Sequence, residues 1–191
     1  MQYTQEELDQ IINQHPIWLN NADLSGADLS QKDLSKARLL RANLAGANLN
    51  RTNLSGADLT YADLSEADLS ESTLKMTSLG GATLHKANLS RTNLEDADLS
   101  RTMLTEADLS QASLPRANLS EANLTGANLH RANLTEANLS ETTLIDANLS
   151  QADLSRANLR ESDMSGADTE GANFKGADTE FAVMPDGTME E

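Results

Sequence analysis

Residues 117–140 read ANLSEANLTGANLHRANLTEANLS, in which one five-residue pattern occurs five times in succession. The pattern extends far beyond this stretch, because every fifth residue from Leu24 to Leu159 is a leucine, 28 in an unbroken series. The residue two positions before each leucine is usually alanine, and the residue between them is usually aspartate or asparagine. A serine or threonine commonly follows the leucine, and then a variable residue that is often charged.

A period of five fits neither a regular helix nor a flat strand. On an α-helix, steps of five residues advance by about 500°, so the leucines would spread around the whole cylinder. On a strand, an odd period sends successive leucines to opposite faces. The chain must therefore turn once in every repeat, with leucine and alanine inside, aspartate or asparagine outside, and the next two residues at a corner. Such coils bury their apolar side chains only by stacking, and the register alone predicts that Leu94 and Leu114 are fully buried.

The stretches ADLSGADLS (residues 22–30) and ANLSEANLT (residues 117–125) resemble the pentapeptide repeat family, whose motif is A-[DN]-L-x-x and whose members are abundant in cyanobacteria. The resemblance covers residues 22–181 without a break in phase. It implies an all-β solenoid, a right-handed quadrilateral β-helix with four repeats in each coil and about eight coils in this chain. The five-residue spacing by itself also permits a three-sided coil.

The two ends of a stacked solenoid need covers, because otherwise they expose apolar surface and open strand edges. Thr4 and Glu7 have the spacing of a capping box, and Pro16 ends a helix, so we expect a helix over residues 4–15. We therefore divide the chain into a capping helix with its linker (1–21), the repeat rod (22–181) and a C-terminal cap (182–191). The sequence PDG at 185–187 predicts a turn in that last segment.

Two departures from the repeat lie inside the rod. Lys32 occupies an inward position that is normally alanine, and we expect its stem to leave the first coil beneath the N-terminal helix. The stretch KMTSLGG (residues 75–81) places Met76 and two glycines at corners, and we interpret it as one loosened corner.

Composition limits the classes of function. The chain of 191 residues has a net charge of −16, which argues against direct binding to nucleic acid or to anionic membranes. It contains no cysteine and no long apolar run, and its first residues lack the features of a signal peptide, so we expect a cytoplasmic protein. His85 and His130 fall on different sides of the coil, and no base or oxyanion loop accompanies the many serines. We therefore expect no enzyme activity, no metal or other cofactor, and no small-molecule substrate.

The function must then reside on the outer surface, and binding of another protein is the leading hypothesis. In a four-sided coil the side that begins at Asp23 carries a net charge of −5, whereas the opposite side, which begins at Asp33, carries about +1. The residues that could contact a partner on the acidic side are Asp23, Asp63, Glu66, Glu106, Asp146 and Asp163. One branch of the family mimics DNA and binds type II topoisomerases such as gyrase, which makes DNA mimicry the alternative. The rod carries less than half the charge density of duplex DNA, and this argues against the alternative.

Overall fold

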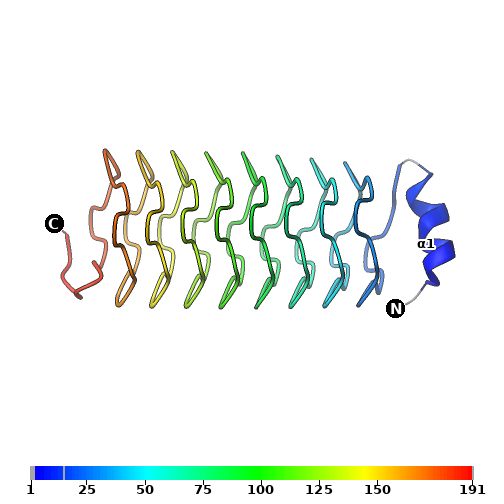
Figure 1. The fold of residues 1–191 in the computed structure, drawn as a ribbon, viewed down its shortest axis with the longest axis horizontal. Helices are drawn as coiled ribbons and strands as arrows, with labels where there is room; N and C mark the ends of the chain where they lie inside the picture. Colours follow the sequence, from blue (N-terminus) through cyan, green and yellow to red (C-terminus); the bar gives the residue numbers. More distant parts are fainter. Residues whose placement is uncertain (1–2, 15, 191) are drawn as a thin grey trace.

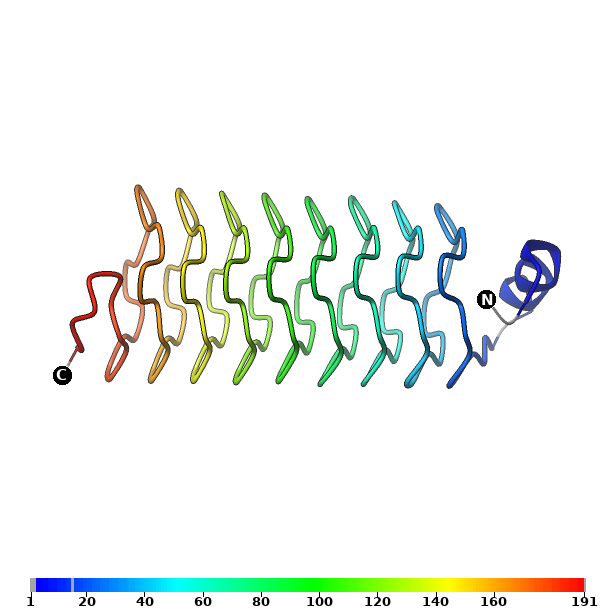
Figure 2. The same ribbon diagram turned by 90° about the horizontal axis from the view of Figure 1, so that it is seen from below.

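The computed structural model describes residues 3–14 and 16–190. These residues form a straight rod of stacked coils with the helix α1 (Gln5–Ile12) lying across one end (Figure 1 and Figure 2). The described chain enters at the helix and leaves at the far end, so the termini lie at opposite ends of the rod. Within the described residues, no helix is long and apolar enough to cross a membrane.

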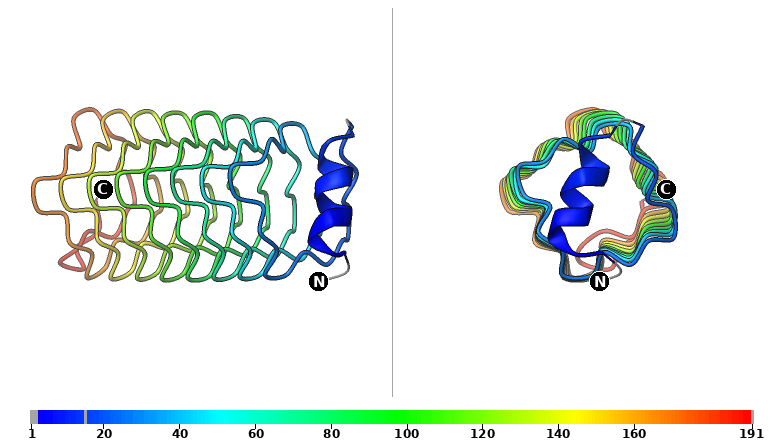
Figure 3. Two further views of the ribbon diagram at one scale, coloured as in Figure 1. Left: turned by 45° about the vertical axis from the view of Figure 1, so that its right-hand side comes forward. Right: turned by 90° about the vertical axis from the view of Figure 1, so that its right-hand side faces the viewer.

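Four repeats complete one coil, as the family resemblance implies. Parallel bridges join residues that are 20 apart in the sequence, for example Asp23 with Asn43 and Asn118 with Asn138. Each bridge involves a single residue pair, so the described coils contain no β-strand longer than one bridge residue. Seen down its axis, the rod has a four-cornered outline in which successive coils lie almost on top of one another (Figure 3). Residues 22–181 therefore make eight coils, and at ~4.8 Å per coil they span roughly 38 Å.

The interior is a column of leucine layers. Every leucine of the series from Leu24 to Leu159 is 0% exposed, and Leu94 and Leu114 are among them, which confirms the predicted register. Threonine replaces the inward alanine at some positions without leaving an unpaired hydroxyl: Thr52 donates to the carbonyl of Leu29 over 2.7 Å, and Thr102 to that of Leu99. The inside of the rod is thus filled with side chains.

Each corner is a tight turn. The amide of Ala27 donates to the carbonyl of Leu24 over 3.0 Å, and Gly26 between them has φ of +65°. This is the pattern of a type II turn, which needs positive φ at its third residue. Glycine suits the position, yet Arg51 and Glu121 adopt it with φ of 57° and 59°. Bonds between coils hold these residues there: the amide of Arg51 donates to Ser70 and that of Glu121 to Ser140.

The N-terminal cap has the predicted capping box, but the helix is shorter than predicted. Thr4 accepts from the amide of Glu7, and the Glu7 carboxylate accepts from the amide of Thr4. The helix ends at Ile12 because Asn13 takes the C-cap position; of the predicted range 4–15, residue 15 lies outside the described residues. Lys32 leaves the first coil beneath α1, as expected, and its Nζ lies 2.9 Å from the Asp9 carboxylate.

The C-terminal end closes with a reversed segment. Val183 pairs with Met189 in an antiparallel bridge, and the turn between them includes Gly187, whose φ is +81°. The predicted PDG turn is therefore present. Phe174 and Met184 are partly buried against the last leucine layers, so larger side chains fill the end of the core.

The prediction of a loosened corner at 75–81 is wrong. Ser78 keeps its bridges to Asp58 and Asp98, and the amide of Met76 donates to the carbonyl of Glu95 over 3.0 Å. The glycine at position 81 leaves room for the Tyr61 ring of the preceding coil. A Cβ added at Gly81 would lie only 2.5 Å from that ring.

Candidate functional site

The outward polar side chains form ladders that run along the rod. Asn43 donates from Nδ2 to Asp23 over 3.2 Å, and Asn173 donates to Asp153 over 2.9 Å. The same carboxylates and amides accept from the backbone two residues later, as in the bond of 3.0 Å from the Ser155 amide to Asp153. Ladder carboxylates with both kinds of bond, such as Asp23 and Asp153, are therefore held from two directions.

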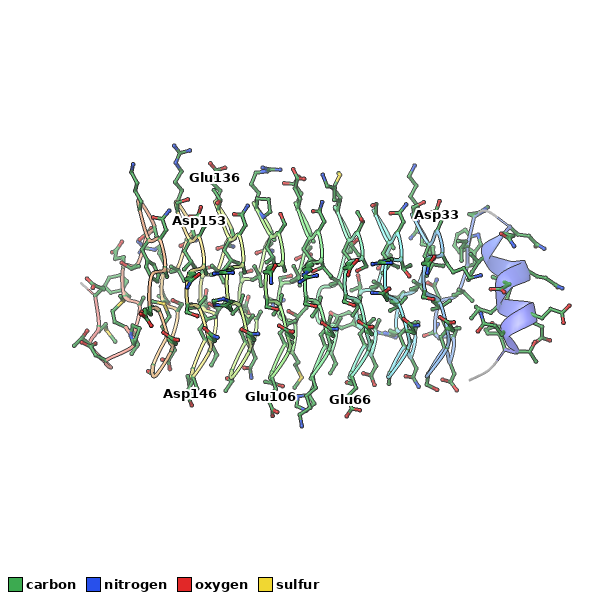
Figure 4. The ribbon with its side chains drawn as sticks, in the orientation of Figure 1. Asp33, Glu66, Glu106, Glu136, Asp146 and Asp153 are labelled. Atoms are coloured by element: carbon green, nitrogen blue, oxygen red, sulfur yellow. The ribbon has the colours of Figure 1, made fainter. Side chains whose placement is uncertain are left out.

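The predicted acidic residues lie on one side of the rod, in two rows. Asp23, Asp63 and Asp163 belong to the column in the middle of the face. Glu66, Glu106 and Asp146 follow one another along its edge (Figure 4). Asp33, Glu136 and Asp153 lie along the upper border of the rod in the same view, away from Glu66, Glu106 and Asp146 (Figure 4).

These carboxylates do not form one continuous patch. Lys86 stands between Glu66 and Glu106 in the edge row, with its Nζ 3.5 Å from the Glu106 carboxylate. Asp63 and Asp163 are five coils apart, or about 24 Å, whereas the screening length at physiological salt is about 8 Å. Met103, half exposed at 50%, interrupts the middle column between them. The acidic side is best described as spaced single charges.

Hydrogen bonds from a neighbouring serine favour the charged form of two ladder aspartates, Asp23 and Asp153. The Ser25 hydroxyl, with the Ser25 amide, contributes to lowering the pKa of Asp23 to about 2. On the opposite side, the Ser155 hydroxyl and amide lower the pKa of Asp153. In these two repeats the serine that follows the leucine thus stabilises the ionised form of the outward carboxylate.

The other edge of the acidic side carries a second row of charged and aromatic residues, which the sequence reasoning did not single out. We call it the Tyr61 ridge. Its members are Asn21, Arg41, Tyr61, Gly81, Arg101, Glu121, Glu141, Glu161 and Phe181. The Arg41 guanidinium lies 5.9 Å from the centre of the Tyr61 ring, and Arg101 pairs with Glu121 over 2.8 Å.

Two large apolar side chains of the Tyr61 ridge reach the solvent. Tyr61 is 61% exposed and Phe181 is 46% exposed. Arg160 lies over the Phe181 ring, 5.7 Å from its centre. These contacts join residues 20 or 21 apart in the sequence, so a coil length of 20 residues, once known, predicts them.

Two open hollows lie around Gly56, at the corner formed by Lys36, Gly56 and Met76 in successive coils. One, of about 470 Å³, is lined by Lys36, Ser55, Gly56, Lys75 and Met76. Another, of about 390 Å³, adjoins it between Lys36 and Ser78. The sequence reasoning did not foresee them. They arise because Gly56 leaves a gap between the side chains above and below it.

His85 and His130 form hydrogen bonds between coils on the outer surface. His85 is hydrogen bonded through Nδ1 to Thr105 over 2.7 Å, and His130 to Ser150 over 2.8 Å. Residues 3–14 and 16–190 contain no group of three or more histidine, cysteine, aspartate or glutamate side chains placed to hold a metal ion.

Comparison with known protein families identifies the repeat. The family model described as "Pentapeptide repeats" matches eight copies. The matched residues are 19–56, 37–75, 62–101, 77–114, 104–141 and 137–176. The chain is a pentapeptide repeat protein. A comparison with curated protein sequences found no match.

Solved structures of other pentapeptide repeat proteins resemble this one. HetL from the cyanobacterium Nostoc sp. strain PCC 7120, which is involved in the regulation of heterocyst differentiation, is 39% identical over 91% of this chain and 89% of its own, with a TM-score of 0.49. A protein of the Arabidopsis thaliana thylakoid lumen is 33% identical over 49% of this chain and 66% of its own, with a TM-score of 0.46. QnrB1, a plasmid-mediated fluoroquinolone resistance protein, is 16% identical over 84% of this chain and 90% of its own, with a TM-score of 0.44. Proteins of the pentapeptide repeat family are mostly non-catalytic.

Proposed function

We propose that this pentapeptide repeat protein is a non-enzymatic scaffold, a right-handed quadrilateral β-helix that presents a rigid acidic surface to another protein. The observation that carries the proposal is the double fixing of outward side chains, as in Asn43 and Ser25 on Asp23 of the acidic side. A partner that docks on a preorganised surface loses less conformational entropy in binding than one that must order flexible side chains.

The charge distribution supports the C-terminal half as the docking region. Residues 22–101 hold 11 acids and nine bases, a net charge of −2, whereas residues 102–181 hold 13 acids and five bases, a net charge of −8. A basic partner surface would be drawn to this second half, chiefly through a faster rate of association. The acidic edge supplies Glu106 and Asp146 there, with Asp163 in the middle column.

A charge-reversal experiment tests the proposal. The triple variant E66K/E106K/D146K changes corner side chains, and we expect it to lose a partner that the wild type captures from the native host. The matched control is E71K/D96K/E136K, which makes the same change in charge on the two corners that border the opposite side. Exposed ion pairs such as Arg156–Glu136 contribute little to stability, so both variants should fold. Equal capture by the wild type and both variants would contradict the acidic surface as the docking site.

DNA mimicry is tested in the same series. A mimic of duplex DNA should inhibit gyrase supercoiling at micromolar concentration, and the triple variant should abolish the inhibition. We expect no inhibition by the wild type, because several carboxylates on the corners, such as Glu121, are already paired with arginine. Inhibition that the triple variant removes would replace the general scaffold with the DNA mimic.

A further inference from the structure

The acidic side of the rod has a twofold pattern that a second copy of the same chain would match. This side is bounded by the Tyr61 ridge on one edge and by the row that contains Glu66, Glu106 and Asp146 on the other. It carries Tyr61, Met103 and Phe181, which are three of the six exposed large apolar side chains in the described residues. Exposed aromatic residues and methionine are typical of the core of an interface.

The Tyr61 ridge divides into two halves of opposite character. Its first half contains Arg41, Tyr61 and Arg101, and its second half contains Glu121, Glu141 and Glu161. Glu141 and Glu161 have no ion-pair partner within 4 Å among the described residues. Like charges in adjacent coils are only about 4.8 Å apart, so the second half repels itself unless cations from outside approach it.

Two copies laid side by side in opposite directions bring cations close to those carboxylates: Arg101 of one copy lies one coil from Glu141 of the other, and Arg41 lies one coil from Glu161. We place a twofold axis in the face, perpendicular to the rod, between the coils of Arg101 and Glu121. The Tyr61 ridge of one copy then lies against the Tyr61 ridge of the other copy, and the two ridges run in opposite directions. The opposed residues are Arg101 with Glu121, Gly81 with Glu141, Tyr61 with Glu161, and Arg41 with Phe181. The two Arg101–Glu121 ion pairs meet as a square of alternating charges, whereas parallel copies would bring like charges together.

The same axis also matches the other edge of the face. In that row bulky acids oppose glycines: Glu66 faces Gly166, Glu106 faces Gly126, and Asp186 faces Gly46. Lys86 faces Asp146. One type of opposition, which the twofold axis repeats, is unfavourable, because Asp63 of each copy faces Asp163 of the other in the middle column. Ladder positions accept asparagine as readily as aspartate, so this repulsion can be removed without disturbing the coil.

The area suits a weak, reversible dimer. The face is about eight coils long and five residues wide, so two copies would bury roughly 1,100 Å² in total. Stable specific interfaces begin at about 1,200 Å². We therefore expect a dissociation constant of about 10–100 μM.

We propose that the face between these two edges binds a second copy of the chain as an antiparallel, twofold-symmetric dimer. The inference rests on the proposed function, since it names the partner of the same acidic surface. It also explains why one ridge of an acidic protein concentrates its arginines in one half and its free glutamates in the other.

Sedimentation velocity of the full chain at 5–500 μM tests the dimer. The variant E141K/E161K brings the net charge from −16 to −12, so general repulsion between molecules falls and non-specific association should strengthen. Specific pairing demands the opposite, and we expect dimerisation to weaken at least tenfold. The control E136K/E170K makes the same change in charge on the corners bordering the opposite side and should leave the dimer unaffected.

Two further variants test the antiparallel register. Neither R101E nor E121K should self-associate, but an equimolar mixture should form a heterodimer, because residue 101 of each copy then opposes a residue 121 of opposite charge. D63N should tighten the wild-type dimer about threefold or more by removing the one like-charge opposition, whereas D153N, its counterpart on the opposite side, should not.

A wild type that stays monomeric at 500 μM, or a mixture that shows no heterodimer, overturns the dimer. It does not touch the proposed function, whose test is the capture of a different protein from the host. Conversely, a dimer that follows these variants while the capture experiment recovers nothing would leave the second copy as the only supported partner.

Discussion

Truncation of one core leucine provides the sharpest test of the register. Leu94 is 0% exposed and is held between leucine layers of the coils above and below. Leu94→Ala removes the equivalent of about three methylene groups, which lowers the free energy of unfolding by about 2.4 kcal/mol in transfer terms. A residual cavity of about 60 Å³ adds about 1.4 kcal/mol, because the stacked backbone cannot collapse into it. We therefore expect a loss of about 4 kcal/mol.

The natural control is Leu40, which follows the core residue Leu39 but stands at a corner and is half buried. Leu40→Ala removes the same atoms from a position outside the leucine column, so it should cost less than about 1 kcal/mol. Urea denaturation followed by circular dichroism measures both. With a slope of about 2 kcal/mol/M, the Leu94 variant should unfold at about 2 M less urea. Equal midpoints for the two variants would refute the argument that register alone decides burial.

Three other outcomes follow from the caps and corners. Removal of residues 1–16 uncovers the first leucine layer, so light scattering should show larger particles than in the full chain. Gly81→Ala should displace the Tyr61 ring and change its near-ultraviolet circular dichroism, whereas Gly46→Ala, whose added Cβ meets nothing within 4 Å, should only cost about 1 kcal/mol of backbone strain. Acid should destabilise α1. The Thr4 amide lowers the pKa of Glu7, and Lys32 lowers the pKa of Asp9. The stabilisation that these two carboxylates give to α1 is therefore present above about pH 4 and is lost as the pH falls through the lowered pKa values. The protection of α1 amides against hydrogen exchange, relative to the intrinsic rate at each pH, should fall over that range in the wild type, and less in D9N.

The core could be predicted from sequence because it depends on a single number. Once the period of five is known, Leu94 must be buried whatever its neighbours are. The outer surface depends on a second number, the 20 residues in a coil, which spacing alone leaves open and which came from the family resemblance. Tyr61 and Gly81 show the difference: the glycine seemed to loosen its own corner, but it accommodates a ring from the preceding coil.

Grouping charges by face was also insufficient. The count of −5 for the acidic side treats Asp63 and Asp163 as members of one patch, although they lie farther apart than salt allows them to act together. Charges interact mainly with their neighbours in the same column. The relevant pattern is therefore the order of residues along each column, as in the two halves of the Tyr61 ridge.

That order obeys a rule in the ladders: no aspartate bridges directly to another aspartate among the described residues. Asp28, Asn48 and Asp68 alternate, and Asn48 donates to Asp28 over 3.1 Å. Asn48→Asp would place three carboxylates in a row about 4.8 Å apart, and each new repulsion costs about 1 kcal/mol in a water-like dielectric. We expect a loss of about 2 kcal/mol at low salt that shrinks markedly in 1 M NaCl.

Asn138 provides the matched control for this last prediction. It also donates one bond from Nδ2 and accepts from the backbone amide two residues later, but it stands between Asn118 and Asn158. Asn138→Asp loses the same hydrogen bond without creating a stack of charges, so its cost should be smaller and insensitive to salt. If both variants lose the same stability and respond equally to salt, repulsion within columns does not limit the ladders. If they differ as expected, aspartate can fill at most every second ladder position, and any strongly acidic function of the rod must depend on its corners.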